Sequence, residues 1–203
     1  MLSEYQHGFR ANHSTESAVI QFTNIVHSYL ENKHHVVGIF IDLSKPFDSL
    51  NHMILLNKLK HKGIRGVPLQ LFKNYLKNRT QSVFCNEHYS SSDIIKTGVP
   101  QGSILGPILF LVYIDDITNA SSKLNYTIYA DDTSLLIPDN DLHNLHKNLQ
   151  TELQFINQWV KTNNLTLNIS KTNFILFQNR SLNYQMPPLL LEGNIVKNVT
   201  HMK

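Results

Sequence analysis

Two adjacent acids, Asp131 and Asp132, are the residues of this sequence that are best placed to do chemistry. They stand between two apolar runs, 126–130 and 133–137, whose β-branched and aromatic residues predict the two strands of a hairpin with the acids at its tip. Neighbouring residues on a straight strand point to opposite faces, so only a turn directs two consecutive carboxylates toward one place. Carboxylates crowded in this way repel one another unless they are protonated or a divalent cation neutralises them. The pattern favours a metal platform, with a plain polar turn as the alternative interpretation.

Two further acidic positions must be weighed against this pair. Asp42 directly follows the apolar run Val36–Ile41, which predicts a central strand covered on both faces. A buried strand that ends in an acid is a common way to build a site. The second acidic pair, Asp115 and Asp116, ends an apolar helix and resembles a solvated helix terminus, so it is the weaker candidate.

Two other segments carry residue types that suit a ligand. The stretch 98–103 is a loop bounded by glycines that runs into an apolar helix beginning near Ile104. Glycines allow the backbone to approach a ligand closely, although a plain strand-to-helix connection has the same composition. Lys171 precedes a strand-like run, and a solvated surface lysine is its alternative interpretation.

The elements that position these residues follow from hydrophobic spacing and from capping residues. We expect a helix after Ser14, a helix through 54–59 that Gly63 ends, a helix from Pro68, a strand pair formed by 81–85 and 94–97, a long helix capped by Asp139 or Asp141, a strand at 174–177, and a hairpin around 192–194.

Composition limits the class of protein. A chain of 203 residues with 41% hydrophobic residues is long enough for one domain with a real core. Its net charge of +3 permits nucleic acid as a partner, and its Lys and Arg residues are scattered over several segments. The single cysteine, Cys85, excludes an intramolecular disulfide and suits a reducing compartment. Residues 1–10 are mostly polar and the longest apolar run falls short of the ~20 residues of a membrane span, so we expect an intracellular protein, nuclear or cytoplasmic, that is not secreted and has no membrane partner.

Four segments occur in a fixed order: an acid that ends a buried strand (41–52), a Gly-x-Pro-Gln-Gly loop (98–111), a Tyr-Ala-Asp-Asp hairpin (129–133) and a Leu-x-Leu-Asn-x-x-Lys-Thr segment whose lysine motif is 168–172. Together they resemble the palm of reverse transcriptases, most closely those of LINE-type, non-LTR retrotransposons, and 6–10 matches the upstream motif of that group. The resemblance covers nearly the whole chain.

The resemblance implies an α+β polymerase palm in which a small antiparallel sheet packs on helices, with partial fingers and the thumb absent. The finger motifs that hold triphosphate would lie before residue 1, and the thumb would lie beyond Lys203. Residues 1–203 would form a single reverse transcriptase domain fragment. Within it, 1–35 and about 51–97 would supply finger and palm helices and the strand pair, and 36–50 and 98–203 would form the palm core.

The resemblance also implies roles for single residues. Asp42, Asp131 and Asp132 would hold two Mg²⁺ ions, with Mn²⁺ as a possible substitute, roughly 3.5 to 4 Å apart as in other two-metal sites. Lys171 would give a proton or charge to the pyrophosphate. Phe47 would exclude a ribose 2′-hydroxyl, although a core aromatic is the alternative for that position. The expected nucleotide-binding residues are Leu43, Phe47, Pro100, Gln101 and Gly102.

The expected activity is RNA-directed DNA polymerisation, in which deoxynucleoside triphosphates extend a DNA primer on an RNA template. The alternative is a catalytically inactive retroelement remnant that folds as a palm and at most binds nucleic acid. Pro46 favours this alternative, because it replaces the small residue usual in the family and removes a backbone donor. An RNA-directed RNA polymerase is disfavoured by Phe47, since a ribonucleotide needs room for its 2′-hydroxyl.

Overall fold

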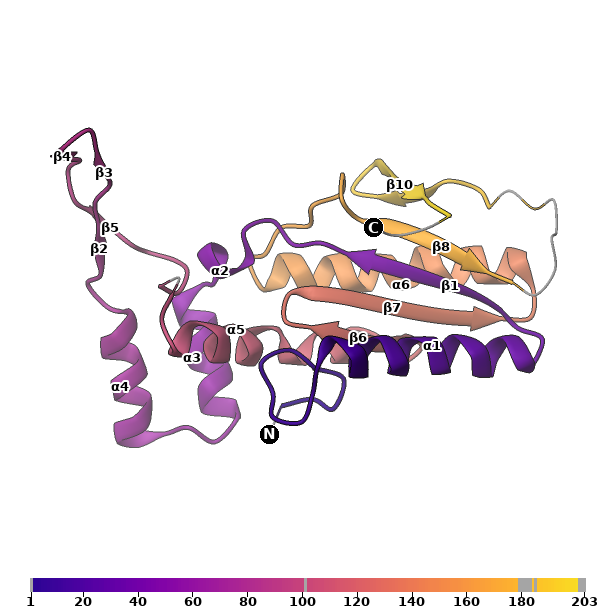
Figure 1. Cartoon of the computed structure of the whole chain (residues 1–203), viewed down its shortest axis with the longest axis horizontal. Coiled ribbons are helices and arrows are strands. Elements are labelled where there is room, and N and C mark those ends of the chain that lie inside the picture. The colour runs from indigo at the N-terminus through magenta and orange to yellow at the C-terminus, as the bar shows by residue number, and fades with distance from the viewer. Residues whose placement is uncertain (1, 101, 179–183, 185, 201–203) are drawn as a thin grey trace. The chain divides into compact units, whose positions relative to one another are not determined.

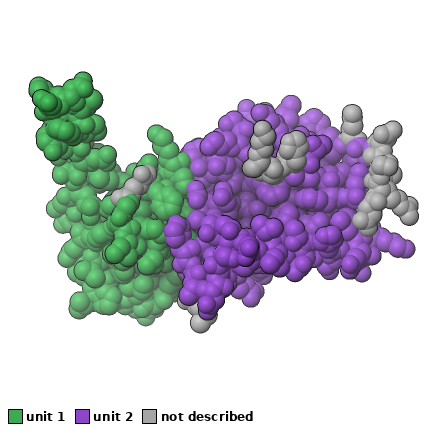
Figure 2. Space-filling view, viewed as in Figure 1, with its two compact units in different colours: residues 1, 45–113 green, residues 2–44, 114–203 purple. Residues whose placement is uncertain are grey.

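The computed structural model describes residues 2–100, 102–178, 184 and 186–200, and it divides into two compact units (Figure 2). Residues 45–113 form unit 1, and residues 2–44 and 114–203 form unit 2. Unit 2 contains α1 (Thr15–Glu31), β1 (His35–Ile41), the 3₁₀ helix η1 (Asp115–Asn119), β6 (Asn125–Tyr129), β7 (Asp132–Asp139), α6 (Leu142–Thr162), β8 (Asn173–Phe177), β9 (Leu189–Leu191) and β10 (Asn194–Asn198).

The sheet of unit 2 has six strands in the order β6-β7-β1-β8-β10-β9. Neighbouring strands are antiparallel except β8 and β10, which pair in parallel (Figure 1). The central strand β1 pairs with β7 on one side and with β8 on the other, and four of its apolar side chains are buried: Val36, Val37, Ile39 and Ile41. The predicted α+β fold with a sheet packed on helices is confirmed, and so is the central strand.

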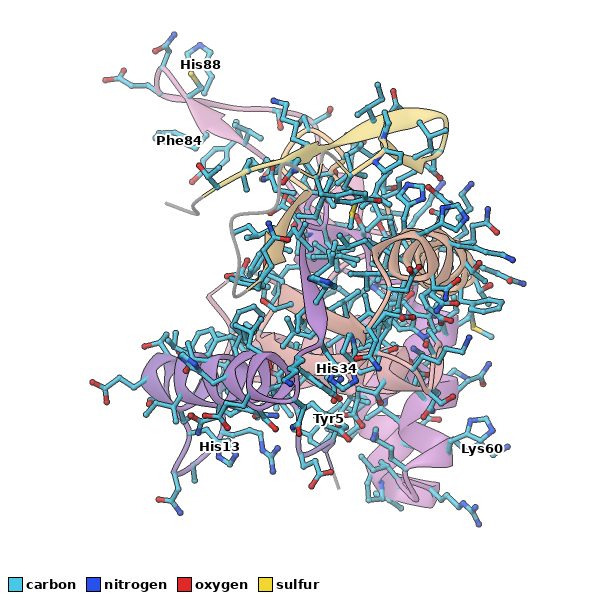
Figure 3. The ribbon with its side chains drawn as sticks, turned by 90° about the vertical axis from the view of Figure 1, so that its right-hand side faces the viewer. Tyr5, His13, His34, Lys60, Phe84 and His88 are labelled. Atoms are coloured by element: carbon cyan, nitrogen blue, oxygen red, sulfur yellow. The ribbon has the colours of Figure 1, made fainter. Side chains whose placement is uncertain are left out.

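Helices α1 and α6 lie on opposite sides of β1 when unit 2 is viewed along the sheet (Figure 3). The aromatic rings of Phe22 in α1 and Phe40 in β1 are 5.5 Å apart, which fixes the face that α1 covers. Helix α6 buries a stripe at helical spacing, formed by Leu145, Leu149, Glu152, Leu153, Ile156 and Val160. Both helices therefore hold the sheet through apolar burial, which stabilises helices of this kind more than helix propensity does.

The predicted caps of these helices are present. Ser14 caps α1, since its side chain accepts a hydrogen bond from the backbone N–H of Ser17. Asp141, one of the two acids proposed for α6, accepts a hydrogen bond of 2.8 Å from the N–H of Asn144. Both caps satisfy backbone donors that an α-helix leaves without partners in its first turn.

Unit 1 contains α2 (Pro46–Ser49), α3 (His52–His61), α4 (Gly66–Leu76), β2 (Thr80–Gln81), β3 (Phe84–Cys85), β4 (His88–Tyr89), β5 (Asp93–Ile94) and all but the last residue of α5 (Leu105–Ile114). Helix α3 ends as predicted, because Gly63 has a φ of 90° just beyond the cap residue Lys62.

The predicted pairing of 81–85 with 94–97 is wrong in detail, because residues 80–94 form two nested pairs of two-residue strands. β2 pairs with β5, and β3 pairs with β4. The ladder is interrupted at Val83, whose N–H donates to the side chain of Ser90 at 2.9 Å. Cys85 is exposed here and does not pack in a core.

None of the helices in the described ranges is long and apolar enough to cross a bilayer.

Candidate active site at the end of the central strands

The hairpin formed by β6 and β7 turns through two residues, Ala130 and Asp131. Tyr129 and Asp132 are the last residues that pair across it. Ala130 has a φ of 55°, the left-handed value that glycine usually supplies at the first central position of a type II′ turn. The predicted hairpin is confirmed, and the acids lie in two different places: Asp131 in the turn and Asp132 at the start of β7.

Asp42 reaches the same end of the sheet from the neighbouring strand. Ile41 of β1 lies opposite Thr133 of β7, so continuing the antiparallel register by one residue puts Asp42 opposite Asp132. Residues directly opposite each other on antiparallel strands share one face of the sheet. The structure therefore brings the three predicted metal-binding acids, Asp42, Asp131 and Asp132, together in unit 2.

The electrostatic coupling of these acids is seen in the Asp132 carboxyl. Burial raises its pKa above the usual value, and the carboxylates of Asp131 and Asp42 raise it further. Asp132 also forms part of the wall of a cavity of about 260 Å³, together with Phe40 and Tyr129. Asp132 is exposed to solvent, but this apolar surrounding removes water from one side of its carboxylate, which disfavours the charged form.

The donor chemistry of the cluster fits a divalent cation. Carboxylate oxygens are the hard ligands that Mg²⁺ and Mn²⁺ prefer, and a cation would relieve the repulsion that raises the pKa of Asp132. Across the described ranges, no group of three or more His, Cys, Asp or Glu side chains is already arranged as a metal site.

The segment that carries Lys171 is tied to the backbone around Asp42. The N–H of Asn168 donates to the carbonyl of Asp42 at 2.8 Å, and Leu43 forms a β-bridge with Leu167. Lys171 lies in the turn that follows, exposed to solvent, and its N–H donates to the carbonyl of Asn168 at 3.1 Å. The structure thus places the lysine segment next to the first acid, whereas the side chain of Leu43 is buried.

The other expected nucleotide-binding residues belong to unit 1. Phe47 is half-buried in α2, with its ring 4.5 Å from that of Phe110. Pro100 lines a cleft of about 530 Å³ in this unit, together with Gly98 and Arg79. Gly102 is exposed with a φ of 79°.

Gln101 lies outside the described residues.

Pro46 is accommodated as the first residue of α2. Proline is favoured at this position because an N–H in the first turn has no partner within the helix. The preceding residue, Lys45, takes a left-handed conformation with a φ of 45°. The missing donor of Pro46 therefore leaves the local hydrogen bonding intact.

The acidic pair Asp115 and Asp116 has structural partners. A carboxylate oxygen of Asp115 accepts a hydrogen bond of 2.6 Å from the N–H of Ser3, and Asp116 accepts one of 3.2 Å from the indole N–H of Trp159. The pair is therefore held by hydrogen bonds and is not the solvated terminus that the sequence predicts, and its standing as the weaker candidate stays a prediction.

Sequence reasoning missed Gln6 and Gly8, which contact the turn that carries the acids. Gln6 binds the backbone of Ala130, 124 positions away in the chain. The motif at 6–10 marked the segment, but no local pattern indicates a partner that far along the sequence.

The raised pKa of Asp132 predicts the pH dependence of stability in metal-free protein. Between the ordinary carboxyl pKa and the raised folded value, the folded state binds more protons than the unfolded state, so stability falls as pH rises through this window. We expect Asp132→Asn to raise the free energy of unfolding at pH 7, by only about 0.5 kcal/mol because solvent screens the charge of an exposed group. The gain should vanish below the ordinary carboxyl pKa. Urea unfolding with a chelator at both pH values measures this, and an equal gain at both would contradict the coupling.

Known proteins resemble this chain over most of its length. Residues 1–189 match the family described as reverse transcriptase (RNA-dependent DNA polymerase). The RNA-directed DNA polymerase from mobile element jockey of Drosophila melanogaster is 32% identical over 97% of this chain and 22% of its own length. The probable RNA-directed DNA polymerase from transposon BS of the same species is 31% identical over 100% of this chain and 23% of its own. The chain spans about a fifth of the length of these curated relatives.

The fold is also found in solved structures. A telomerase from Candida albicans, in complex with a fragment of telomeric RNA, aligns with a TM-score of 0.64 and 14% identity over 90% of this chain and 32% of the telomerase chain. The chain belongs to the reverse transcriptase family. The resemblance to reverse transcriptases of non-LTR retrotransposons, inferred from the four motif segments, is confirmed by the matches to jockey and BS.

Proposed function

We propose that this chain carries the polymerising centre of an RNA-directed DNA polymerase of a non-LTR retrotransposon, which adds deoxynucleotides to a DNA primer on an RNA template. The observation that carries the proposal is the convergence of Asp42, Asp131 and Asp132 at one end of the sheet. The names of the related proteins support the same activity. We further propose that residues 1–203 are one fragment of a reverse transcriptase domain, with palm and partial fingers divided as the sequence predicts.

The three acids would hold two Mg²⁺ ions, for which Mn²⁺ can substitute. Bound cations of this kind activate the primer hydroxyl and neutralise charge on the leaving pyrophosphate. The chain itself contributes alignment, because the β6–β7 turn fixes Asp131 and Asp132. The hydrogen bond from the N–H of Asn168 and the 3.5 Å contact with Thr172 hold the backbone of Asp42. Lys171, on the same segment, would bring positive charge to the pyrophosphate.

The charge of unit 1 supports a nucleic-acid partner. This unit has nine Lys and Arg residues against three Asp and Glu, a net charge of +6, while unit 2 has nine against twelve, a net charge of −3. The basic residues are divided equally between the units, but most of the acids lie in unit 2, so unit 1 alone carries a net positive charge. Four exposed cations lie on or beside α3 and α4, with Lys60 labelled in Figure 3: Lys60, Arg65, Lys73 and Lys77. Such a surface suits the phosphates of an RNA template and a DNA primer.

The nucleotide side of the site would come from Leu43, Phe47, Pro100, Gln101 and Gly102. The cleft beside Pro100 supports this assignment, because it contains the cation Arg79 within unit 1. A deoxynucleoside triphosphate carries the negative charge that an arginine binds well.

Replacement of Phe47 by Ala tests its proposed role in sugar selection. Without the ring, we expect the preference for deoxynucleotides over ribonucleotides to fall by about 10- to 100-fold, the range that steric discrimination in a pocket provides. The measurement is the ratio of the two incorporation rates on one RNA template, which does not depend on the fraction of folded protein. Phe155→Ala, in which another partly exposed ring is removed from α6, is the matched control. An unchanged ratio in Phe47→Ala would remove Phe47 from this role.

The proposal is tested by primer extension on an RNA template with Mg²⁺ and deoxynucleoside triphosphates. We expect products that lengthen with time and that disappear when the ion is chelated. The inactive remnant makes the opposite prediction: the chain shows the helix and strand content described above by circular dichroism and gives no product on any template.

A further inference from the structure

The segment that precedes α1 lies along β6 and reaches the turn between the acids. The N–H of His7 donates to the carbonyl of Ile128 at 2.7 Å, and the N–H of Ile128 donates to the carbonyl of Tyr5 at 2.9 Å. Gln6 and Ile128 form a parallel β-bridge. The chain therefore adds a short extra pairing to the outer edge of β6, and this pairing points Gln6 toward Ala130.

The side-chain amide of Gln6 binds both backbone polar groups of Ala130. Its Nε2 donates to the carbonyl of Ala130 at 3.3 Å, and its Oε1 accepts a hydrogen bond of 2.9 Å from the N–H of Ala130. The same Oε1 accepts a second bond of 2.7 Å from the N–H of Gly8. Gln6 is 2% exposed, so these bonds are shielded from water.

The surrounding loop holds Gln6 against the turn. A Cβ at Gly8 would lie 2.3 Å from the backbone nitrogen of Ala130, so no larger residue fits without moving the two segments apart. Nη1 of Arg10 donates to the carbonyls of Ser3 and Gln6 at 2.6 and 3.0 Å. The ring of His7 is bound to Ser17 Oγ at 2.7 Å, which anchors the loop to α1.

This contact acts on the residue that sets the direction of the acids. Ala130 has a φ of 55°, a value that residues other than glycine rarely adopt unless their surroundings impose it. Asp131 and Asp132 follow it directly, so a relaxation of Ala130 would move both carboxylates relative to Asp42.

We propose that Gln6 is a positioning residue: it holds Ala130 in its left-handed conformation and thereby fixes the positions of Asp131 and Asp132 relative to Asp42. What these carboxylates are used for rests on the proposed function, whereas the restraint on the turn does not. Gln6 acts through Ala130 and takes no direct part in binding substrate or metal.

The chain contains a matched control for this contact. Gln150 of α6 binds the two backbone groups of Leu190 in the same manner, since its Nε2 donates to the carbonyl at 2.6 Å and its Oε1 accepts from the N–H at 2.9 Å. Gln6→Ala and Gln150→Ala therefore each remove a pair of bonds between a glutamine amide and one backbone residue of unit 2, and Gln6→Ala also removes the bond with Gly8. Only the first lies beside the acids.

Two readouts on the full 203-residue chain test the proposal. The first is hydrogen exchange of the Ala130 amide measured by NMR, which we expect Gln6→Ala to accelerate by about 10-fold or more and Gln150→Ala to leave unchanged. The second is binding of Mn²⁺ followed by the electron paramagnetic resonance signal of the free ion. We expect the dissociation constant to rise by about 10-fold in Gln6→Ala, as for residues that orient metal ligands, and by less than about twofold in Gln150→Ala.

A second variant distinguishes positioning from general loss of structure. Glycine takes a positive φ without strain, so in an Ala130→Gly background the change from Gln6 to Ala should weaken Mn²⁺ binding less than it does in the unsubstituted chain. Equal Ala130 exchange in Gln6→Ala and the parent would overturn the proposal, as would faster exchange with unaltered Mn²⁺ affinity. Absence of Mn²⁺ binding in the parent chain would contradict the proposed function instead, and the Ala130 amide would still decide whether Gln6 restrains the turn.

Discussion

Asp131→Asn abolishes primer extension on an RNA template, with a fall in rate of about 10³-fold or more. The substitution keeps the size and the hydrogen-bonding atoms of the side chain near the turn but removes the charge that a divalent cation requires. Because the lost charge is one of three that repel one another, the same variant should be at least as stable as the parent in metal-free urea unfolding. A loss of activity without a loss of stability is therefore the expected signature.

The control for this prediction is Asp116→Asn, in the other acidic pair of the chain. Asn can still accept the hydrogen bond from Trp159, so the local structure should persist. We expect its extension rate to stay within about twofold of the parent, a difference far below the loss expected at a metal ligand. Comparable loss in both variants, or retained activity in Asp131→Asn, would reject the assignment of the centre to the β6–β7 turn.

Gly98→Ala destabilises unit 1 by about 3 kcal/mol or more, since two penalties coincide at this residue. Its φ of 82° suits glycine alone, and a Cβ would lie 2.7 Å from the carbonyl oxygen of Asp48. The clash is with backbone, which cannot rotate away as the end of a side chain can. The N–H of Gly98 also donates to the carbonyl of Leu50 at 2.8 Å, so any shift breaks the connection to α2.

Gly63→Ala separates the two penalties. Gly63 has a φ of 90°, and a Cβ added there would meet nothing within 4 Å, so its substitution should cost only about 1 kcal/mol of conformational strain. Urea unfolding of both variants gives the difference directly. Equal losses would mean that the contact between Gly98 and Asp48 is not retained in solution.

Local signals in the sequence predicted most elements of the fold. The apolar run at 36–41 is a buried central strand, and the alternation on both sides of the acids is the β6–β7 hairpin. Ser14, Gly63 and Asp141 mark helix ends because each satisfies or permits a terminal backbone geometry that few residues provide.

What the sequence did not predict depends on contacts between distant segments. A hydrophobic pattern gives the faces of two strands but not which residues turn, so the division of the acids between turn and strand required the Tyr129–Asp132 pairing. The strands of the pairs β2–β5 and β3–β4 are two residues long each, which is too short for a periodic signal. The contact of Gln6 with Ala130 has no local signature at all.

For the site, the sequence predicted which acids take part. That they lie at the same end of the sheet was learned from the register of β1 with β7. The net positive charge of unit 1 was not apparent from the sequence, because it depends on which residues share a compact unit and most of the acids lie in unit 2. The roles of Lys171, Phe47 and the glycine-bounded loop stay predictions, and Phe47→Ala tests the role of the ring.

The most direct test of the metal centre is a crystal structure of the chain grown with Mn²⁺ and a non-hydrolysable deoxynucleoside triphosphate, with anomalous diffraction to locate the ion. Our account predicts anomalous density between the carboxylates of Asp42, Asp131 and Asp132, lost in crystals of Asp131→Asn. Density at Asp115 and Asp116 instead, or no density beside Asp42 at saturating Mn²⁺, would contradict it.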